Sequence, residues 1–192
     1  ASAIAPIAVI MPAHLLSSVE IVAVAARSVA RAHEFAKKHG IPKVHETYDD
    51  LVNDPEIDAI YNPLPNSLHF EWTLKSIMAG KHVLLEKPFT SNEKEANAIA
   101  EMIKEKNKNG GTDAPGQRFK GDIVVIEAFH WRFHPLALRV REILDSGVLG
   151  RIISTNTTLS APGIAFNDDD IRFNLTLSGG SMMDTGSYTI SS

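Results

Sequence analysis

Two ionisable side chains, Glu86 and Lys87, follow the apolar residues 83–85 and precede Pro88. An apolar run of strand length that ends in polar groups is typical of an open α/β sheet, where ligands bind beyond the carboxyl ends of the strands. A lysine there can place an ammonium group near a substrate hydroxyl and favour its deprotonated form. We therefore interpret Lys87 as a candidate catalytic residue; the alternative is an ordinary surface lysine.

A second pair of candidates lies near the carboxyl end of the chain. Asp184 and Tyr188 are four residues apart and share one face if this segment is helical. A phenol with a pKa of about 10 is a poor base at neutral pH, but the ammonium group of Lys87 would stabilise its phenolate. Asp184 would accept a hydrogen bond from a substrate hydroxyl. The alternatives are a buried tyrosine with its hydroxyl satisfied, and a helix-capping or solvated carboxylate.

Strand-like and helix-like segments alternate along the chain and could position these side chains. We expect strands at 19–26, 58–62, 81–86 and 123–127, and helices at 28–39, 48–52, 67–78 and 92–106. Ser28 suits a helix start, and Gly40 suits a helix end. Such alternation implies right-handed βαβ units and a parallel sheet. The sequence thus predicts the α/β class: a doubly wound, parallel, Rossmann-type sheet.

Both ends of the chain suggest incomplete units. A nucleotide-binding domain should begin with a strand, so we expect the sheet to lack its first strand. Residues 151–159 alternate like a strand, which we expect to start a carboxyl-terminal α+β domain. We expect a nucleotide-binding domain at 1–135 and a second domain, for substrate binding and dimerisation, at 136–192, both incomplete in a truncated chain. The polar, glycine-rich stretch 104–122 is interpreted as a surface loop, either a tolerated or a partner-binding insertion.

Composition excludes several classes of function. The 192 residues are 44% hydrophobic and 22% charged, with a formal charge of -4, which gives no basic surface for nucleic acid. No apolar run approaches the roughly 20 residues that span a bilayer. The absence of cysteine removes thiolate chemistry and cysteine metal sites, and the histidines show no HxH or HExxH spacing with acids. We expect no metal and a cytoplasmic location.

Three segments in this order resemble the glucose-fructose oxidoreductase and inositol dehydrogenase family, called Gfo/Idh/MocA. They are residues 59–69, the Glu86-Lys87-Pro88 motif, and residues 179–188. Within the family, the chain resembles the branch of fungal NADP-dependent D-xylose dehydrogenase and dimeric trans-dihydrodiol dehydrogenase. That likeness rests on Ala25-Ala26-Arg27-Ser28, Glu127-Ala128-Phe129, residues 131–135 and Tyr188.

The cofactor choice depends on the end of the first expected strand. Sites that select NAD place an acid there to bind the ribose hydroxyls. Here Arg27 and Ser28 follow Ala26 instead, so a 2′-phosphate meets a guanidinium fork and a hydroxyl, and we predict NADP. The alternative for Arg27 is a surface arginine at a helix start.

The resemblance implies further residues that contact the dinucleotide. Ser2, Ala3 and Ile4 would belong to the phosphate loop, and Glu86 would contact the nicotinamide ribose. A loop beside the dinucleotide and a segment that borders the nicotinamide pocket would add Pro63, Leu64, Asn66, His69, Trp131 and Arg132. The alternatives are turn-forming prolines, a histidine on a helix face, and aromatic residues of the core.

The expected activity is an NADP-dependent oxidoreductase that moves hydride from a carbon that bears a hydroxyl. The resemblance implies a cyclic aldose such as D-xylose, oxidised to its lactone, or a trans-dihydrodiol, with a homodimer as the assembly. Tyr188 would take the hydroxyl proton while Lys87 stabilises the resulting charge. A non-catalytic NADP-binding regulator of the same fold and an inactive fragment remain as alternatives.

Overall fold

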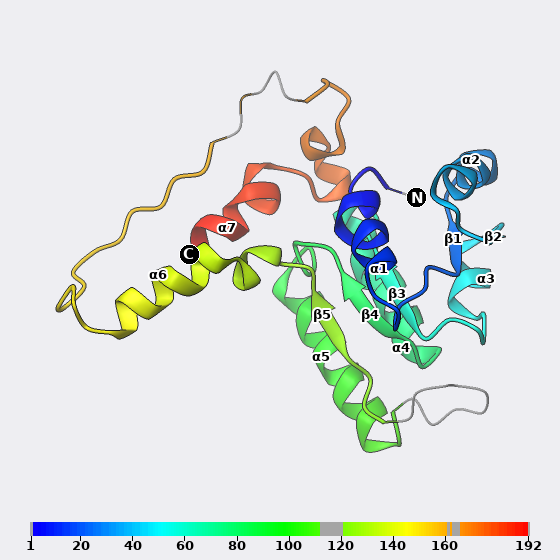
Figure 1. Cartoon of the computed structure of the whole chain (residues 1–192), viewed down its shortest axis with the longest axis horizontal. Helices are drawn as coiled ribbons and strands as arrows, with labels where there is room; N and C mark the ends of the chain where they lie inside the picture. Colours follow the sequence, from blue (N-terminus) through cyan, green and yellow to red (C-terminus); the bar gives the residue numbers. More distant parts are fainter. Residues whose placement is uncertain (1, 112–120, 161, 163–165, 192) are drawn as a thin grey trace.

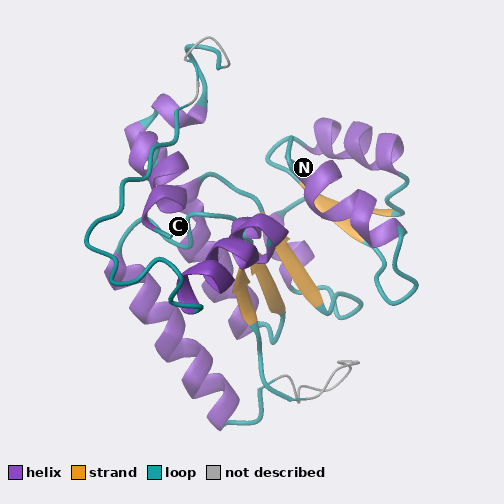
Figure 2. Cartoon of the chain, turned by 60° about the vertical axis from the view of Figure 1, so that its left-hand side comes forward, coloured by secondary structure: helices purple, strands orange, loops and turns teal. Residues whose placement is uncertain are grey.

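All the strands of the described chain are short and run parallel. The computed structural model describes residues 2–111, 121–160, 162 and 166–191. One sheet pairs β1 (Ala23–Ala25) with β2 (Lys43–His45), and a second sheet has the order β3 (Ala59–Asn62), β4 (His82–Leu85), β5 (Val125–Glu127). Figure 1 shows this succession of strands, and Figure 2 shows the two sheets as separate groups of arrows.

The helices between the strands begin and end at the residues that the sequence indicates. Helix α2 (Val29–His39) begins after Ser28, whose Oγ accepts a hydrogen bond from the Arg31 amide, and ends at Gly40 in the left-handed region with φ 68°. The other helices between the strands are α3 (Tyr48–Val52), η2 (Asn66–Leu68), α4 (His69–Met78) and α5 (Glu93–Lys108). Before β1 lie η1 (Pro6–Ile10) and α1 (Met11–His14). The expected alternation of strands and helices is confirmed. Residues 112–120 of the expected loop lie outside the described residues.

An apolar cavity of about 190 Å³ lies between the two sheets. Val24 of β1 and Ile60 of β3 line it, together with Ile10 and Phe35. Within the described chain, β1 pairs with β2 alone and β3 pairs with β4 alone, so two strand edges flank the cavity. A doubly wound sheet without its first strand has this arrangement, because that strand lies in the middle of the sheet. The expected fold class is thus confirmed.

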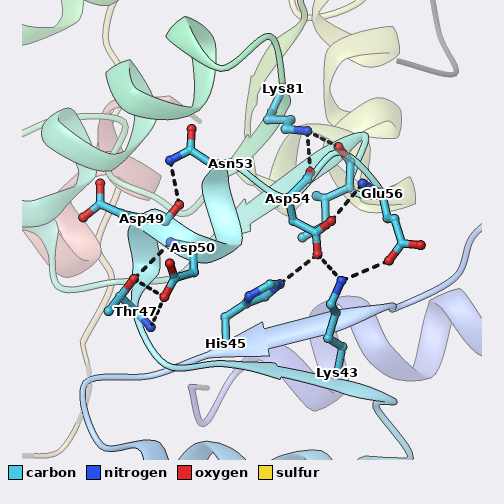
Figure 3. A network of polar contacts seen from close by, with 10 residues as sticks. Lys43, His45, Thr47, Asp49, Asp50, Asn53, Asp54, Glu56 and Lys81 are labelled. Atoms are coloured by element: carbon cyan, nitrogen blue, oxygen red, sulfur yellow. Dashed lines mark hydrogen bonds and ion pairs between the residues drawn. The ribbon is translucent and has the colours of Figure 1, made fainter. Parts of the chain in front are cut away.

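The buried carboxylate of Asp54 ties the two sheets together (Figure 3). Its Oδ2 accepts hydrogen bonds from Nζ of Lys43, at 2.7 Å, and lies 2.8 Å from Nε2 of His45. Buried Lys81 donates to the carbonyl oxygens of Asp54 and Ile57, both at 2.7 Å. Burial raises the pKa of Asp54, but its hydrogen bonds, led by the one from Lys43, outweigh burial and lower the pKa to about 2.

The strand that we expected in the carboxyl-terminal part is not formed, and the elements that the structure describes in this part are helices. Residues 151–160 form neither helix nor strand and are exposed, so the expected strand at 151–159 is wrong. A strand needs a partner for its backbone groups, and alternation alone does not supply one. The expected strand at 19–26 is shorter than predicted for the same reason, since only residues 23–25 pair with β2. The other elements here are η3 (His130–Phe133), α6 (Pro135–Asp145), η5 (Ile171–Phe173), η6 (Leu175–Leu177), η7 (Met182–Gly186) and α7 (Ser187–Ile190).

Candidate active site

Lys87 and Asp184 form an ion pair although 97 residues separate them. Nζ of Lys87 donates to Oδ1 of Asp184 at 2.8 Å and to the Asp184 carbonyl oxygen at 2.7 Å. Arg172 donates from Nε to Oδ2 of the same carboxylate at 3.0 Å, and from Nη1 to Asp170. Burial raises the pKa of Asp184, but Lys87 and Arg172 outweigh it and lower the pKa. Asp184 is therefore ionised at neutral pH and held between two cations.

Tyr188 lies one turn beyond Asp184, with its ring facing the same lysine. Nζ of Lys87 is 5.4 Å from the centroid of the Tyr188 ring. The centroid of the buried Phe129 ring is 4.9 Å from that of the Tyr188 ring. Burial raises the pKa of Tyr188, and the charges of Glu86, Asp184 and Glu127 raise it further. The expectation that Lys87 lowers this pKa is therefore wrong for this arrangement, because the carboxylates and burial dominate. Tyr188 is a phenol at neutral pH.

Glu86 and Lys87 follow β4 directly, as the sequence predicted. The hydroxyl of Tyr61 donates to Oε1 of Glu86 at 2.7 Å, and the backbone amide of Lys87 donates to Oε2 at 3.1 Å. The peptide bond between Lys87 and Pro88 is cis. Both oxygens of Glu86 thus have protein donors, which fix the orientation of its carboxylate at the end of the strand.

The loop after β3 lines the cavity between the sheets and contacts the carboxyl-terminal part of the chain. Pro63 and Leu64 are half-buried and line the cavity between the sheets. The Asn66 side-chain amide donates to the Ser178 carbonyl oxygen at 2.8 Å, so it contacts the carboxyl-terminal part of the chain. His69 is fully buried at the start of α4, with both ring nitrogens against backbone carbonyl oxygens. His69 therefore lies in the interior beneath the loop and is not exposed on the loop surface.

The remaining predicted cofactor residues lie at the ends of other elements. Arg27 and Ser28 are exposed directly after β1. Oγ of Ser2 accepts from the Ala5 amide at 3.2 Å, where a helical segment begins, while Ala3 and Ile4 are exposed. The carboxyl ends of parallel strands share one edge of a sheet, so β3 and β4 place a hydroxyl and a carboxylate along one edge. In the other sheet, β1 is followed by a guanidinium and a hydroxyl. These groups suit the phosphates and ribose hydroxyls of a dinucleotide.

Trp131 and Arg132 belong to η3, which follows β5. The Trp131 ring stacks on the His134 ring with centroids 5.4 Å apart, and the Arg132 guanidinium lies 5.7 Å from the centroid of Phe129. Since Phe129 contacts Tyr188, this segment is one residue layer away from the Lys87 site. Contact of either side chain with a cofactor stays a prediction.

The sequence predicted no role in the site for Arg172, Tyr61, Glu127 or Ser178. Arg172 carried no signal beyond being an arginine 12 positions before Asp184. Tyr61 did carry one, since a tyrosine in a buried strand usually finds a hydrogen-bond partner for its hydroxyl. Ser178 adopts a positive φ of 56°, which no local pattern predicts for serine.

Comparison with known proteins identifies the family of the chain. Residues 7–111 match the model of the oxidoreductase family with an NAD-binding Rossmann fold, and residues 137–192 match the GFO/IDH/MocA C-terminal domain. The chain belongs to the Gfo/Idh/MocA oxidoreductase family. Members of this family provide two close comparisons in sequence. The D-xylose 1-dehydrogenase (NADP(+)) 2 of Haloferax volcanii is 36% identical over 95% of this chain and 51% of its own length. The trans-1,2-dihydrobenzene-1,2-diol dehydrogenase of Danio rerio is 32% identical over 89% and 46%.

A solved structure is also similar to this chain. The 3-ketoreductase from Actinomadura kijaniata, in complex with NADP and TDP-benzene, has a TM-score of 0.77 and 30% identity over 97% of this chain and 52% of that chain. The chain spans about half the length of the curated relatives that it matches. NADP in the name of the Haloferax volcanii enzyme and in the Actinomadura kijaniata complex supports NADP as the cofactor. Within the described residues, no helix is both long and apolar enough to cross a membrane.

Proposed function

We propose that this chain carries the cofactor site and the catalytic groups of an NADP-dependent dehydrogenase that acts on a cyclic aldose such as D-xylose, or on a trans-dihydrodiol. The observation that carries the proposal is the ion pair between Lys87 and Asp184 beside the ring of Tyr188. It joins a strand-end lysine to an acid and a phenol from the carboxyl-terminal part. We further propose domains at 1–135 and 136–192, and a cytoplasmic homodimer.

Each of the three residues has a distinct part in this proposal. Asp184, ionised at neutral pH, accepts a hydrogen bond from a substrate hydroxyl and holds Lys87 in place through their ion pair. Lys87 stabilises negative charge on the substrate oxygen. Tyr188, with its raised pKa, holds a proton that it can give to an alkoxide when a carbonyl is reduced, and it must first lose that proton to act as base in oxidation.

The groups along the strand ends fit NADP. Arg27 and Ser28 would hold the 2′-phosphate, Ser2, Ala3 and Ile4 would lie by the pyrophosphate, and Glu86 would bind the nicotinamide ribose. The dinucleotide would be bordered by Pro63, Leu64, Asn66, Trp131 and Arg132. Buried His69 would instead support this loop through its contact with the Leu64 carbonyl oxygen. When bound, the cofactor accepts or gives the hydride, and the chain supplies orientation and proton transfer.

The test compares Lys87→Met and Tyr188→Phe with matched controls far from the site. Each variant should lower the turnover of D-xylose or of a trans-dihydrodiol at least about 100-fold, with NADP affinity almost unchanged. Lys104→Met, on the exposed face of α5, and Tyr48→Phe, whose ring contacts Trp72, should keep turnover near that of the parent protein.

The measurement is stopped-flow hydride transfer together with NADP titration by fluorescence. If the protein binds NADP but reduces it with neither substrate, the proposal fails and the non-catalytic regulator is favoured. If Lys87→Met or Tyr188→Phe keeps the parent rate, the role of that residue is wrong.

A further inference from the structure

The peptide group that joins Pro88 to Phe89 is held at both ends by ionisable side chains. Nδ1 of His69 lies 2.8 Å from the Pro88 carbonyl oxygen, and the Phe89 amide donates to Oε1 of Glu127 at 2.9 Å. His69 starts α4, and Glu127 ends β5, so these side chains come from two elements that flank the end of β4. One peptide group therefore connects two elements that are 58 residues apart in the sequence.

The second ring nitrogen of His69 meets another backbone carbonyl. Nε2 lies 2.8 Å from the Leu64 oxygen in the loop after β3, and the side chain is fully buried. Carbonyl oxygens only accept hydrogen bonds, so the ring donates to both at once only when both nitrogens carry a proton. Burial lowers the pKa of His69 overall, against the opposing effect of the two carbonyls and of Glu86 and Glu127. Protonation therefore decides whether one or both carbonyls are held.

His69 and Glu127 lie at opposite ends of the dipole of this peptide group. The Pro88 carbonyl oxygen carries partial negative charge and faces Nδ1 of His69, which donates to it when that nitrogen carries a proton. The Phe89 amide hydrogen carries partial positive charge and faces the Glu127 carboxylate. A hydrogen bond with an ionised partner is roughly twice as strong as a neutral one. Bonds at the two ends of one peptide group also polarise each other, which strengthens both.

Lys87 lies immediately before this peptide group. Pro88 has no amide hydrogen, so the peptide group that follows Lys87 directly cannot donate to a neighbouring strand. The next group along the chain, between Pro88 and Phe89, is the first that can be held from both sides. Fixing it restricts the backbone from which the Lys87 side chain reaches Asp184.

We propose that His69 and Glu127 are positioning residues that hold the Pro88–Phe89 peptide group and thereby fix Lys87 in its catalytic position. The proposal rests on the proposed function, because it assigns the two residues an effect on the step that Lys87 assists. His69 also ties that step to the loop of Leu64, which borders the expected dinucleotide site. Neither side chain touches substrate in this proposal.

The first experiment measures kinetics in a set of Glu127 variants, because Glu127 is only half-buried. Glu127→Ala should lower kcat about 10- to 100-fold, the scale of a misplaced catalytic group, with the dissociation constant of NADP changed by less than about twofold. Glu127→Gln keeps an oxygen that accepts the Phe89 amide and should restore most of the loss. Glu95→Ala is the matched control, since Glu95 accepts the Ser91 amide at 3.0 Å without a catalytic neighbour.

A second comparison separates positioning from a general loss of stability. In a Lys87→Met background, Glu127→Ala should cause no further decrease in kcat, because the group that it positions is gone. His69→Gln should behave like Glu127→Ala in both backgrounds. Equal decreases in the parent and Lys87→Met backgrounds, or an unchanged kcat for Glu127→Ala in the parent, would overturn the proposal.

An NMR measurement decides the question without any activity. The ¹⁵Nζ resonance of Lys87 and the hydrogen exchange of the Phe89 amide should both change in Glu127→Ala and stay as in the parent protein in Glu95→Ala. If the protein has no dehydrogenase activity but these signals change, the proposed function fails while the effect of Glu127 on Lys87 stands. If neither signal changes, the positioning role is wrong.

Discussion

The hydroxyl group of Tyr61, in β3, donates a hydrogen bond to Oε1 of Glu86, just after β4, across 2.7 Å. Burial, the hydrogen bond to Glu86 and the charge of Glu86 all raise the pKa of Tyr61, so its hydroxyl stays a donor at any working pH. The contact crosses between neighbouring strands at the edge where ligands bind in such sheets. It sets the direction of the carboxylate that the proposal assigns to the nicotinamide ribose.

Tyr61→Phe should therefore weaken NADP binding about 3- to 10-fold, because it removes one hydrogen bond worth about 0.5–1.5 kcal/mol and lets Glu86 rotate. Isothermal titration calorimetry measures the change. Tyr48→Phe, which removes a hydroxyl from α3, is the control. Identical affinities for the two variants would contradict the role given to this contact.

Arg27→Ala should weaken NADP binding by roughly 1.5–3 kcal/mol, the scale of a hydrogen bond with a charged group, and leave NAD binding almost unchanged. The reason is that only NADP carries the 2′-phosphate that the guanidinium would meet. Arg31→Ala, an exposed arginine one turn later in α2, should change neither affinity. Titration of both cofactors checks this, and an equal loss for NADP and NAD would remove Arg27 from the 2′-phosphate site.

Asn66→Ala should loosen the carboxyl-terminal segment from the sheet, since its amide donates to the Ser178 carbonyl across 112 positions of sequence. The expected loss is about 1 kcal/mol in the local opening of residues 171–191. Hydrogen exchange measured by mass spectrometry reports it peptide by peptide. Exposed Asn97→Ala on α5 is the control, and equal exchange in the two variants would show that the contact does not hold the segment.

The contribution of Asp54 should depend on pH in the acid range. Its pKa is about 2 in the fold, against about 3.9 for an ordinary aspartate, so the unfolded chain binds the proton more tightly. The stabilisation is complete above about pH 5 and is lost as pH falls towards 2. Asp54→Asn should lower the free energy of unfolding by about 1–3 kcal/mol at pH 7 and by much less near pH 2.5.

Urea denaturation at the two pH values measures this difference. Asp145→Asn is the control, because Asp145 is exposed and pairs only with Arg141 within α6 among the described contacts. A destabilisation by Asp54→Asn that is the same at both pH values would contradict the assigned pKa.

Local signals in the sequence predicted the elements that position the site. Ser28 and Gly40 bound α2 because capping depends on a few neighbouring residues. Lys87 was predicted to follow a strand because the apolar run and the charged residues after it are adjacent in the sequence. Asp184 and Tyr188 were placed on one helical face from their spacing alone, and the segment is helical.

Long-range electrostatics and strand pairing were beyond local reasoning. The raised pKa of Tyr188 depends first on burial and then on the charges of Glu86, Asp184 and Glu127, which come from other parts of the chain or from the preceding turn. The segment 151–159 alternates like a strand, but pairing decides whether a strand forms, and pairing depends on residues far away in sequence. The contact of Arg172 with Asp184 was not predicted, because only the folded chain brings these two side chains together.

The division of the sheet into two parts has a consequence for cooperativity. Arg27 follows β1, whereas Glu86 and Lys87 follow β4, so the two ends of a bound dinucleotide would rest on different parts of the sheet. Separate opening of the β1–β2 pair from β3, β4 and β5 would break the contacts of Asp54 with Lys43 and His45. A ligand that spans both parts is lost when either opens. The adenosine end and the reactive end of the cofactor would therefore be thermodynamically linked through the ligand itself.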